Sequence, residues 1–355
     1  MPGIAPTPTG RVDRGLVAAA ALVVIIAGLK AAAGLVAPVA LALVLVVALS
    51  PVQSFLVRHG WPRWLGSLVL LLVVYGLLLA FAGILLVSIG QLSGLVPHYA
   101  AEATAMISEV TGWLAKHGVD SAQVRSALSQ FDPSRLVGLL TSLAGSALSL
   151  LSNLLFILAL LLFMGLDAAG YPTRLERIAA QRPALVSALR RFAGGTRKYL
   201  VVTTVFGLAV AILDGVALWA LAVPLPLLWA LLSFITNYVP NVGFILGLIP
   251  PALLGLLDSG VSTMLWVIAV YCGLNFVLQS LIQPKITGNS VGLSVTLTFL
   301  ALVFWSWVIG GLGAILAVPL TLLAKALLVD TAPNTRWANH LLSSRPLSKD
   351  DKTAA

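Results

Sequence analysis

Four polar side chains recur every four residues along an otherwise apolar stretch, at Tyr271, Asn275, Gln279 and Gln283. Side chains at positions i and i+4 lie on the same face of an α-helix, and a drift of about 40° per step keeps all four within one sector. An unpaired amide in hydrocarbon costs several kcal/mol, so this face must contact protein or water. The stripe therefore predicts either the lining of a polar path or hydrogen bonds between helices.

A second polar group interrupts another apolar stretch, at Asn237, Tyr238, Pro240, Asn241 and Gly243. Pro240 has no amide hydrogen and disfavours helix at the preceding residue, so carbonyl groups in the turn before it need other partners. Irregular backbone at membrane depth is tolerated only inside protein or along a watery cavity. The two asparagines can donate and accept hydrogen bonds, which suits a hydroxylated solute or a hydrated ion. The alternative is a kink packed closely on a neighbouring helix through Gly243.

Asp214 is the only carboxylate deep inside a predicted span, and an acid at that depth is by default a functional hypothesis. It could carry a proton or bind a cation. Alternatively, it is simply protonated, or it is hydrogen-bonded to Thr203 or Thr204 of a neighbouring subunit. Lys285 lies near a span end, where snorkelling explains a lysine, although it could also gate a path or bind an anion.

Two common motifs of soluble enzymes are missing from the sequence. It contains no Gly-x-x-x-x-Gly-Lys-[Ser/Thr] loop for ATP hydrolysis and no His-Glu-x-x-His zinc motif. The single cysteine, Cys272, excludes an intramolecular disulfide. We therefore expect no enzyme activity, no metal and no cofactor.

The elements that must position these residues are transmembrane helices. Of 355 residues, 59% are hydrophobic and only 9% are charged, against about 25% charged residues in a soluble domain. Such a small number of charged residues cannot form a water-exposed surface. Lipid must therefore cover the apolar residues. The net charge of +9 fits cytoplasmic loops of a membrane protein and does not require nucleic acid. We predict an all-α, polytopic transmembrane helical bundle whose main partner is the lipid bilayer, with no nucleic-acid partner.

A membrane span needs about 20 apolar residues. The sequence offers about eight such segments, at 16–34, 35–57, 64–90, 136–166, 199–222, 227–257, 261–283 and 290–329. The first two are interpreted as a transmembrane hairpin and not as a cleaved signal peptide. The last is about 60 Å of helix, twice the hydrocarbon thickness, so it should be two short pieces or a re-entrant hairpin. Two interrupted segments in the last third indicate a transport site.

The flanking charges predict an orientation for these spans. Lys and Arg are in excess in 167–198, which places this segment and both termini in the cytoplasm, whereas 91–135 is external. The helical spacing of apolar residues in 91–135 predicts two short amphipathic helices, and Pro183 should break the cytoplasmic helix. The resulting regions are three N-terminal spans (1–90), an external helical insertion (91–135), a span (136–166), a basic cytoplasmic segment (167–198), a transport block with breaks near 237–243 and 305–313 (199–329) and a cytoplasmic tail (330–355).

Several motifs resemble the autoinducer-2 exporter family of bacterial membrane proteins. They are Asn237 to Gly243, Gln283-Pro284-Lys285 with Gly288, and Phe304-Trp305 continuing through Gly310 to Leu320. The sequence departs from the family at Val295 and Gly311, where relatives often have proline. The resemblance implies eight membrane segments, export of small molecules with autoinducer-2 as the namesake substrate, and a homo-oligomer, namely a pentamer. Some members are described as sodium/proton antiporters, so the family name does not fix the substrate.

We predict a transporter of the bacterial plasma membrane that exports a small polar solute. The first alternative is a cation/proton antiporter that uses Asp214, and the second is a non-transporting scaffold whose amphipathic segments 97–135 and 172–193 bind partners. The predicted pathway residues are Asn237, Tyr238, Pro240, Asn241, Gly243, Tyr271, Asn275, Gln279, Gln283, Lys285 and Asp214. Because a short turn joins the spans 227–257 and 261–283, Asn237 or Asn241 should lie across a polar cavity from Asn275 or Gln279.

Overall fold

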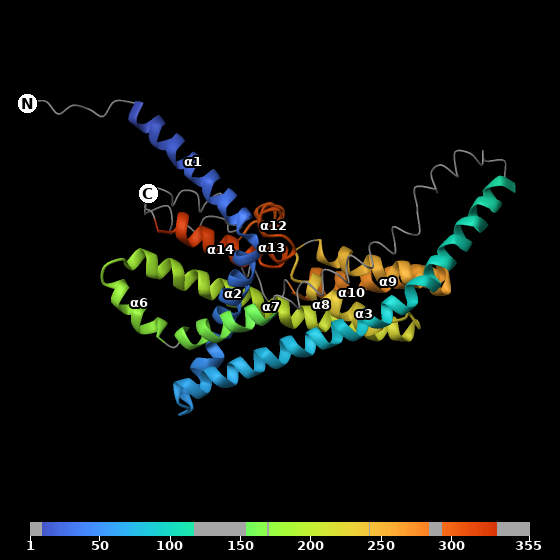
Figure 1. Ribbon diagram of the computed structural model, residues 1–355, viewed down its shortest axis with the longest axis horizontal. Helices are drawn as coiled ribbons and strands as arrows, with labels where there is room; N and C mark the ends of the chain where they lie inside the picture. Colours follow the sequence, from blue (N-terminus) through green and yellow to red (C-terminus); the bar gives the residue numbers. More distant parts are fainter. Residues whose placement is uncertain (1–8, 117–153, 169, 241, 284–292, 332–355) are drawn as a thin grey trace, which may run out of the picture.

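In the described part of the chain all regular elements are helices, as Figure 1 shows for the computed structural model. The structure describes residues 9–116, 154–168, 170–240, 242–283 and 293–331. Four helical stretches in these ranges are long and apolar enough to cross a membrane, namely Ala33–Val52, Leu71–Ser88, Pro183–Ala220 and Val261–Ile282. Shorter apolar helices accompany them. The prediction of an all-α polytopic bundle is confirmed.

The first two helices do not form the predicted hairpin. Only Ala32 separates α1 (Thr9–Ala31) from α2 (Ala33–Arg58), and one residue is too few to fold one helix back along the other. The junction consists of alanines, which are the strongest helix formers and so do not favour a turn. In Figure 1, α1 projects away from the rest of the molecule, while its C-terminal part packs on α12 (Val295–Ile309).

The third helix is far longer than a membrane span. α3 runs from Arg63 to Lys116 as one helix of 54 residues, which is about 81 Å at 1.5 Å per residue. The separate helices predicted within 91–135 are therefore replaced, up to Lys116, by a continuation of α3, and the rest of that region lies outside the described residues. Apolar residues at helical spacing reveal a helix, but they do not show whether it is joined to the helix before it.

Two helices meet at the break that Pro183 predicts. α6 (Tyr171–Ala179) ends shortly before α7 (Pro183–Ala220), and the proline occupies the first turn of α7, where its missing amide hydrogen costs nothing. α7 has 38 residues, so the end of the predicted basic segment and the following span belong to one helix. The helix Leu154–Ala168 precedes α6 and is bent by 62° from the segment Thr173–Ala179, so this pair could form a fifth span.

An interrupted helical pair follows α7. α8 (Pro226–Thr236) has 11 residues and α9 (Gly243–Ser259) has 17, so α8 is only about 16 Å long and too short to cross the hydrocarbon layer. Gly260, with φ of +87°, turns the chain into α10 (Val261–Asn275), which packs along α9. α10 continues directly into the π-helix η1 (Phe276–Ile282).

The last apolar segment is also divided, into α12 (Val295–Ile309), α13 (Gly311–Ile315) and α14 (Ala317–Leu328). Gly310 has φ of +74°, a conformation that favours glycine. A Cβ atom at Gly313 would lie 2.0 Å from the carbonyl oxygen of Trp305, so only glycine permits this close return of the chain. The break predicted near 305–313 therefore has a local cause.

An arginine compensates for a proline where α2 meets α7. Pro51 lies inside α2 and lacks the amide hydrogen that would bond to the Val47 carbonyl oxygen. Arg197 of α7 donates from Nε to that oxygen at 2.9 Å and from an Nη atom to Ser50 Oγ at 2.6 Å. Ser50 Oγ also donates to the Val47 oxygen, at 2.9 Å. The proline thus creates an acceptor through which α7 is joined to α2.

Candidate transport site

The α8–α9 break lies where Pro240 predicts it, and its carbonyl groups have partners. Helix α8 ends at Thr236, whose carbonyl oxygen accepts from the Val239 amide at 2.8 Å. The carbonyl oxygen of Tyr238 accepts from the Tyr199 hydroxyl of α7 at 2.9 Å. Irregular backbone at this depth is therefore satisfied by protein, as membrane burial requires.

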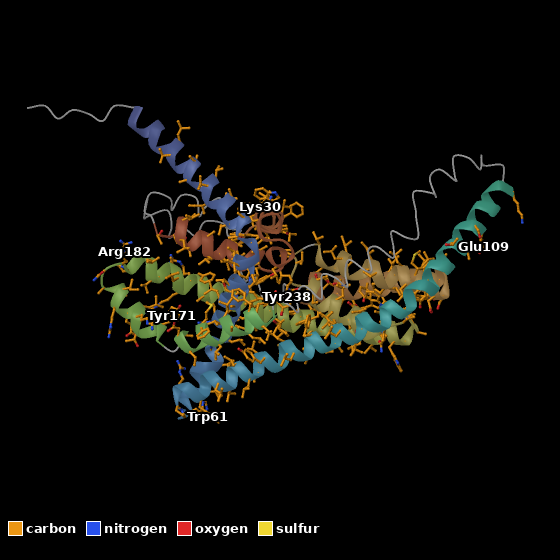
Figure 2. The ribbon with its side chains drawn as sticks, in the orientation of Figure 1. Lys30, Trp61, Glu109, Tyr171, Arg182 and Tyr238 are labelled. Carbon is orange, nitrogen blue, oxygen red and sulfur yellow. The ribbon has the colours of Figure 1, made fainter. Side chains whose placement is uncertain are left out.

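The side chain of Tyr238 joins the break to α7 a second time. Its hydroxyl lies 2.7 Å from Thr204 Oγ1, and Thr204 Oγ1 donates its one hydrogen to the Leu200 carbonyl at 2.6 Å. Tyr238 must therefore be the donor in the contact with Thr204. Figure 2 shows Tyr238 in the middle of the molecule, away from both ends.

Three amide side chains form one hydrogen-bonded chain beside the break, which we call the amide chain (Asn237, Gln279 and Asn275). Gln279 Nε2 donates to Asn237 Oδ1 at 2.9 Å and to Asn275 Oδ1 at 2.6 Å. Asn275 Nδ2 donates to the Tyr271 carbonyl oxygen at 2.9 Å. The predicted proximity of Asn237 to Gln279 is thus found, but the two amides touch directly and do not face each other across a cavity.

Glycines bring the neighbouring helices close to the amide chain. A Cβ atom at Gly207 of α7 would lie 3.0 Å from Asn237 Nδ2. On α9, a Cβ atom at Gly243 would lie 1.8 Å from the Thr236 carbonyl oxygen, and one at Gly247 would lie 2.9 Å from Thr236 Oγ1. The close-contact surface that was the alternative interpretation of Gly243 is therefore present, and it lies next to the polar group.

Gln279 lies in a π-helix that the polar and apolar pattern did not predict. η1 begins directly after Asn275 and contains Gln279. In a π-helix the backbone bonds from i to i+5, so α-helical geometry accounts for the shared face of Tyr271 and Asn275 only, and the contact of Gln279 with Asn275 at 2.6 Å is made within the π-helical turn. Such segments are rare and are frequent at functional sites.

Asp214 is fully buried, and its partner Ser233 lies one helical turn before Asn237 of the amide chain. The Asp214 side chain is 0% exposed, and Oδ2 accepts from Ser233 Oγ of α8 at 2.5 Å. Among the described residues, neither Asp214 Oδ1 nor the buried hydroxyl of Tyr271 has a hydrogen-bond partner. The acid is therefore bonded within its own chain, and Thr204, one of its suggested partners, bonds to Tyr238 instead.

The two interrupted segments of the last third lie against each other. Val239, in the α8–α9 break, packs with Leu302 of α12 and Ala317 of α14 in one buried apolar cluster. Trp305 Nε1 of α12 donates to Thr321 Oγ1 of α14 at 3.0 Å, which ties the second broken element together. The second broken element thus packs against the first through apolar side chains. Among the described residues it contributes no hydrogen bond to the amide chain.

The structure brings most of the predicted pathway residues together. Asp214, Tyr271, Asn275, Gln279, Asn237 and Tyr238 form a polar region between α7, α8 and α10, with Pro240 and Gly243 at its break. Gln283 directly follows η1, and Asn241 and Lys285 lie outside the described residues. Sequence reasoning missed Tyr199 and Ser233 as members of this region. Ser233 precedes Asn237 by four residues, so the i+4 rule could have indicated it.

Sequence comparison shows which known proteins this chain resembles. The sequence pattern of the "AI-2E family transporter" matches residues 20–332, which is most of the chain. The chain belongs to the AI-2E transporter family. As a member, it is a membrane transporter and not an enzyme, and the scaffold alternative loses its support.

Named relatives match over nearly their whole length. The AI-2 transport protein TqsA of Escherichia coli K12 is 32% identical over 318 residues, covering 88% of this chain and 90% of that protein. "Putative transport protein YhhT" of the same strain is 28% identical over 331 residues, covering 93% and 94%. A "Putative transport protein" of Haemophilus influenzae is 29% identical over 328 residues, covering 91% and 94%.

Proposed function

We propose that this AI-2E family transporter exports a small, uncharged, hydroxylated solute across the bacterial membrane, and that the amide chain binds this solute. One observation carries the proposal. Gln279 bonds at once to Asn237 and Asn275, at the point where α8 is interrupted. The similar protein TqsA, named as an AI-2 transport protein, makes autoinducer-2 the first solute to test.

The chemistry of the amide chain suits such a solute. Asn and Gln side chains donate and accept hydrogen bonds without carrying charge, so they can pair with both roles of a hydroxyl group. A hydrogen bond between membrane helices is worth about 0.6 kcal/mol, so a solute hydroxyl can replace one at little cost. A break in the helix supplies the local mobility that such an exchange of partners needs.

The test replaces the central amide. In proteoliposomes containing the purified full chain, Gln279→Leu should reduce autoinducer-2 flux on the order of tenfold, while the thermal unfolding midpoint stays near that of the wild type. Thr298→Val is the matched control, because the Thr298 hydroxyl donates to the Ser294 carbonyl of its own helix at 3.0 Å. If Gln279→Leu transported autoinducer-2 as well as Thr298→Val does, the amide chain would not be the solute site.

A second candidate function is cation/proton antiport, and the burial of Asp214 favours it. A carboxylate inside a span is a common carrier of protons or cations. Radiolabelled Na⁺ flux in the same proteoliposomes separates the two functions. Antiport predicts Na⁺ movement driven by a proton gradient in the absence of any organic solute, whereas solute export predicts none.

A further inference from the structure

Three buried side chains from three helices lie beside the amide chain and have no part in the proposed solute binding: Ser233 is hydrogen-bonded to Asp214, and Asp214 interacts electrostatically with Tyr271. They are Asp214 of α7, Ser233 of α8 and Tyr271 of α10, which we call the acid site. Ser233 lies four residues before Asn237, and Tyr271 lies four residues before Asn275. Residues at this spacing are neighbours on one helix face, so α8 and α10 each connect the acid site to the amide chain.

Two buried polar atoms of the acid site are left without a hydrogen-bond partner by the described residues. Asp214 is 0% exposed and Tyr271 is 1% exposed. Asp214 Oδ2 has Ser233 Oγ at 2.5 Å, whereas Asp214 Oδ1 and the Tyr271 hydroxyl have no hydrogen-bond partner in the described part of the chain. An unpaired buried polar atom costs free energy, and two in one place indicate a function for them.

No positive charge lies near enough to pair with Asp214 in the described ranges. α8 carries no ionisable side chain, and α10 carries only Tyr271 and Cys272. On α7, Lys198 lies 16 residues earlier, about 24 Å along the helix. Of the charged groups on helices packed against α7 and α10, Lys325 of α14 pairs with Asp330 at 3.2 Å, and Asp258 of α9 accepts a hydrogen bond from Tyr99 at 2.9 Å.

These contacts favour a proton over a metal cation as the charge partner of Asp214. An ionised carboxylate with one neutral hydrogen bond is costly to bury, so it must be neutralised. Hard metal cations take several oxygen ligands, and the acid site offers one carboxylate and two hydroxyl groups. The described residues hold no group of three or more His, Cys, Asp or Glu side chains suited to a metal ion. A proton needs only the carboxylate itself.

We propose that Asp214 is the proton-binding residue that couples transport to the proton gradient. In the conformation described here Asp214 holds the proton as a neutral acid. When α7, α8 and α10 separate enough to admit water, the carboxyl group releases its proton to that water and becomes a carboxylate. Because Ser233 lies in the last turn of α8 and its carbonyl oxygen accepts from the amide of Asn237, which directly follows α8, the same movement changes the amide chain. The proposal rests on the proposed transport function for its physiological role, but proton binding can be measured without transport.

The first measurement detects the proton directly. Infrared difference spectra of the purified full chain in lipid, recorded between neutral and alkaline pH, should contain the carbonyl band of a buried protonated carboxylic acid. Asp214→Asn should lose this band, whereas Asp258→Asn, which alters an exposed carboxylate, should keep it. A band that persists in Asp214→Asn, or no such band in the wild type, would overturn the proposal. If Asp214→Asn does not fold, Ser233→Ala must shift the band, because it removes the hydrogen bond to Oδ2.

The second measurement tests coupling, with autoinducer-2 as the probe. With an imposed proton gradient, Asp214→Asn proteoliposomes should accumulate on the order of tenfold less autoinducer-2 than wild type. Exchange of autoinducer-2 at equal pH on both sides should persist, because that process needs no net proton movement. Unchanged gradient-driven accumulation, or loss of exchange as well, would overturn the coupling role. If the wild type moved no autoinducer-2 at all, the proposed function would fail while the infrared result would still decide proton binding.

Discussion

At the scale of single residues, the site depends on how closely α7 approaches the break. Asn237 is held by Gln279 on one side and faces Gly207 on the other, where a Cβ atom would lie 3.0 Å from its Nδ2 atom. That separation is tighter than an ordinary carbon contact, so Asn237 would have to shift slightly for any other residue at position 207. The position of the Asn237 side chain thus depends on the absence of a side chain at position 207.

This arrangement predicts a loss of transport in Gly207→Ala. The added methyl group should displace Asn237 from Gln279 and lower autoinducer-2 flux several-fold, while the helix itself tolerates alanine well. Gly194→Ala is the matched control on the same helix, because a Cβ atom there meets nothing within 4 Å. It should transport normally and unfold at an equal or higher temperature. If both variants had wild-type flux, close approach at Gly207 would be unimportant for transport.

At the scale of elements, prolines and glycines made the positions of the helix breaks predictable. The hydrogen-bond partners at those breaks were not predictable from the sequence. Pro183 and Pro240 lie where helices begin or are interrupted, and glycines mark the turns at Gly260 and Gly310. Single-sequence patterns could not show that α10 becomes π-helical, since π-helical turns are rare insertions in α-helices and have no apolar pattern of their own. They also could not show that α3 continues to Lys116, because periodicity persists across a possible boundary.

The contact of Arg197 with α2 makes a prediction about stability. Arg197→Met keeps the long side chain but removes the donors to the Val47 carbonyl and to Ser50, and it should lower the free energy of unfolding by about 1–3 kcal/mol. Lys198→Met, at an exposed neighbouring position, should have little effect. In a Pro51→Ala background, which restores the amide donor for Val47, the Arg197 substitution should cost less. Equal costs in both backgrounds would mean that Arg197 does not compensate for the proline.

At the scale of the whole molecule, the distribution of positive charge predicts an orientation that the structure alone does not fix. The far end of α3 and the α6–α7 turn lie at opposite ends of the molecule, as Glu109 and Arg182 mark in Figure 2. The basic end is predicted to be cytoplasmic, together with both termini. A homopentamer also remains a prediction, from the family resemblance only.

Two serines offer a matched test of this orientation. Ser108 of α3 and Ser187 of α7 are both exposed, and each hydroxyl donates to a carbonyl of its own helix, at 2.7 Å and 2.9 Å. In a Cys272→Ala background, an impermeant thiol reagent should label Ser108→Cys in intact cells and Ser187→Cys only after the cells are opened. The reverse pattern would show that the predicted orientation is wrong.

The central claim is that Asn237 and Gln279 bind the transported solute as one unit, and a double-mutant cycle of autoinducer-2 flux tests it most directly. Groups that act together are strongly non-additive when they are removed. We predict that Asn237→Leu and Gln279→Leu each reduce flux on the order of tenfold and that the double variant is no worse than either one. Wild-type flux in either single variant, or losses that multiply in the double variant, would contradict the account.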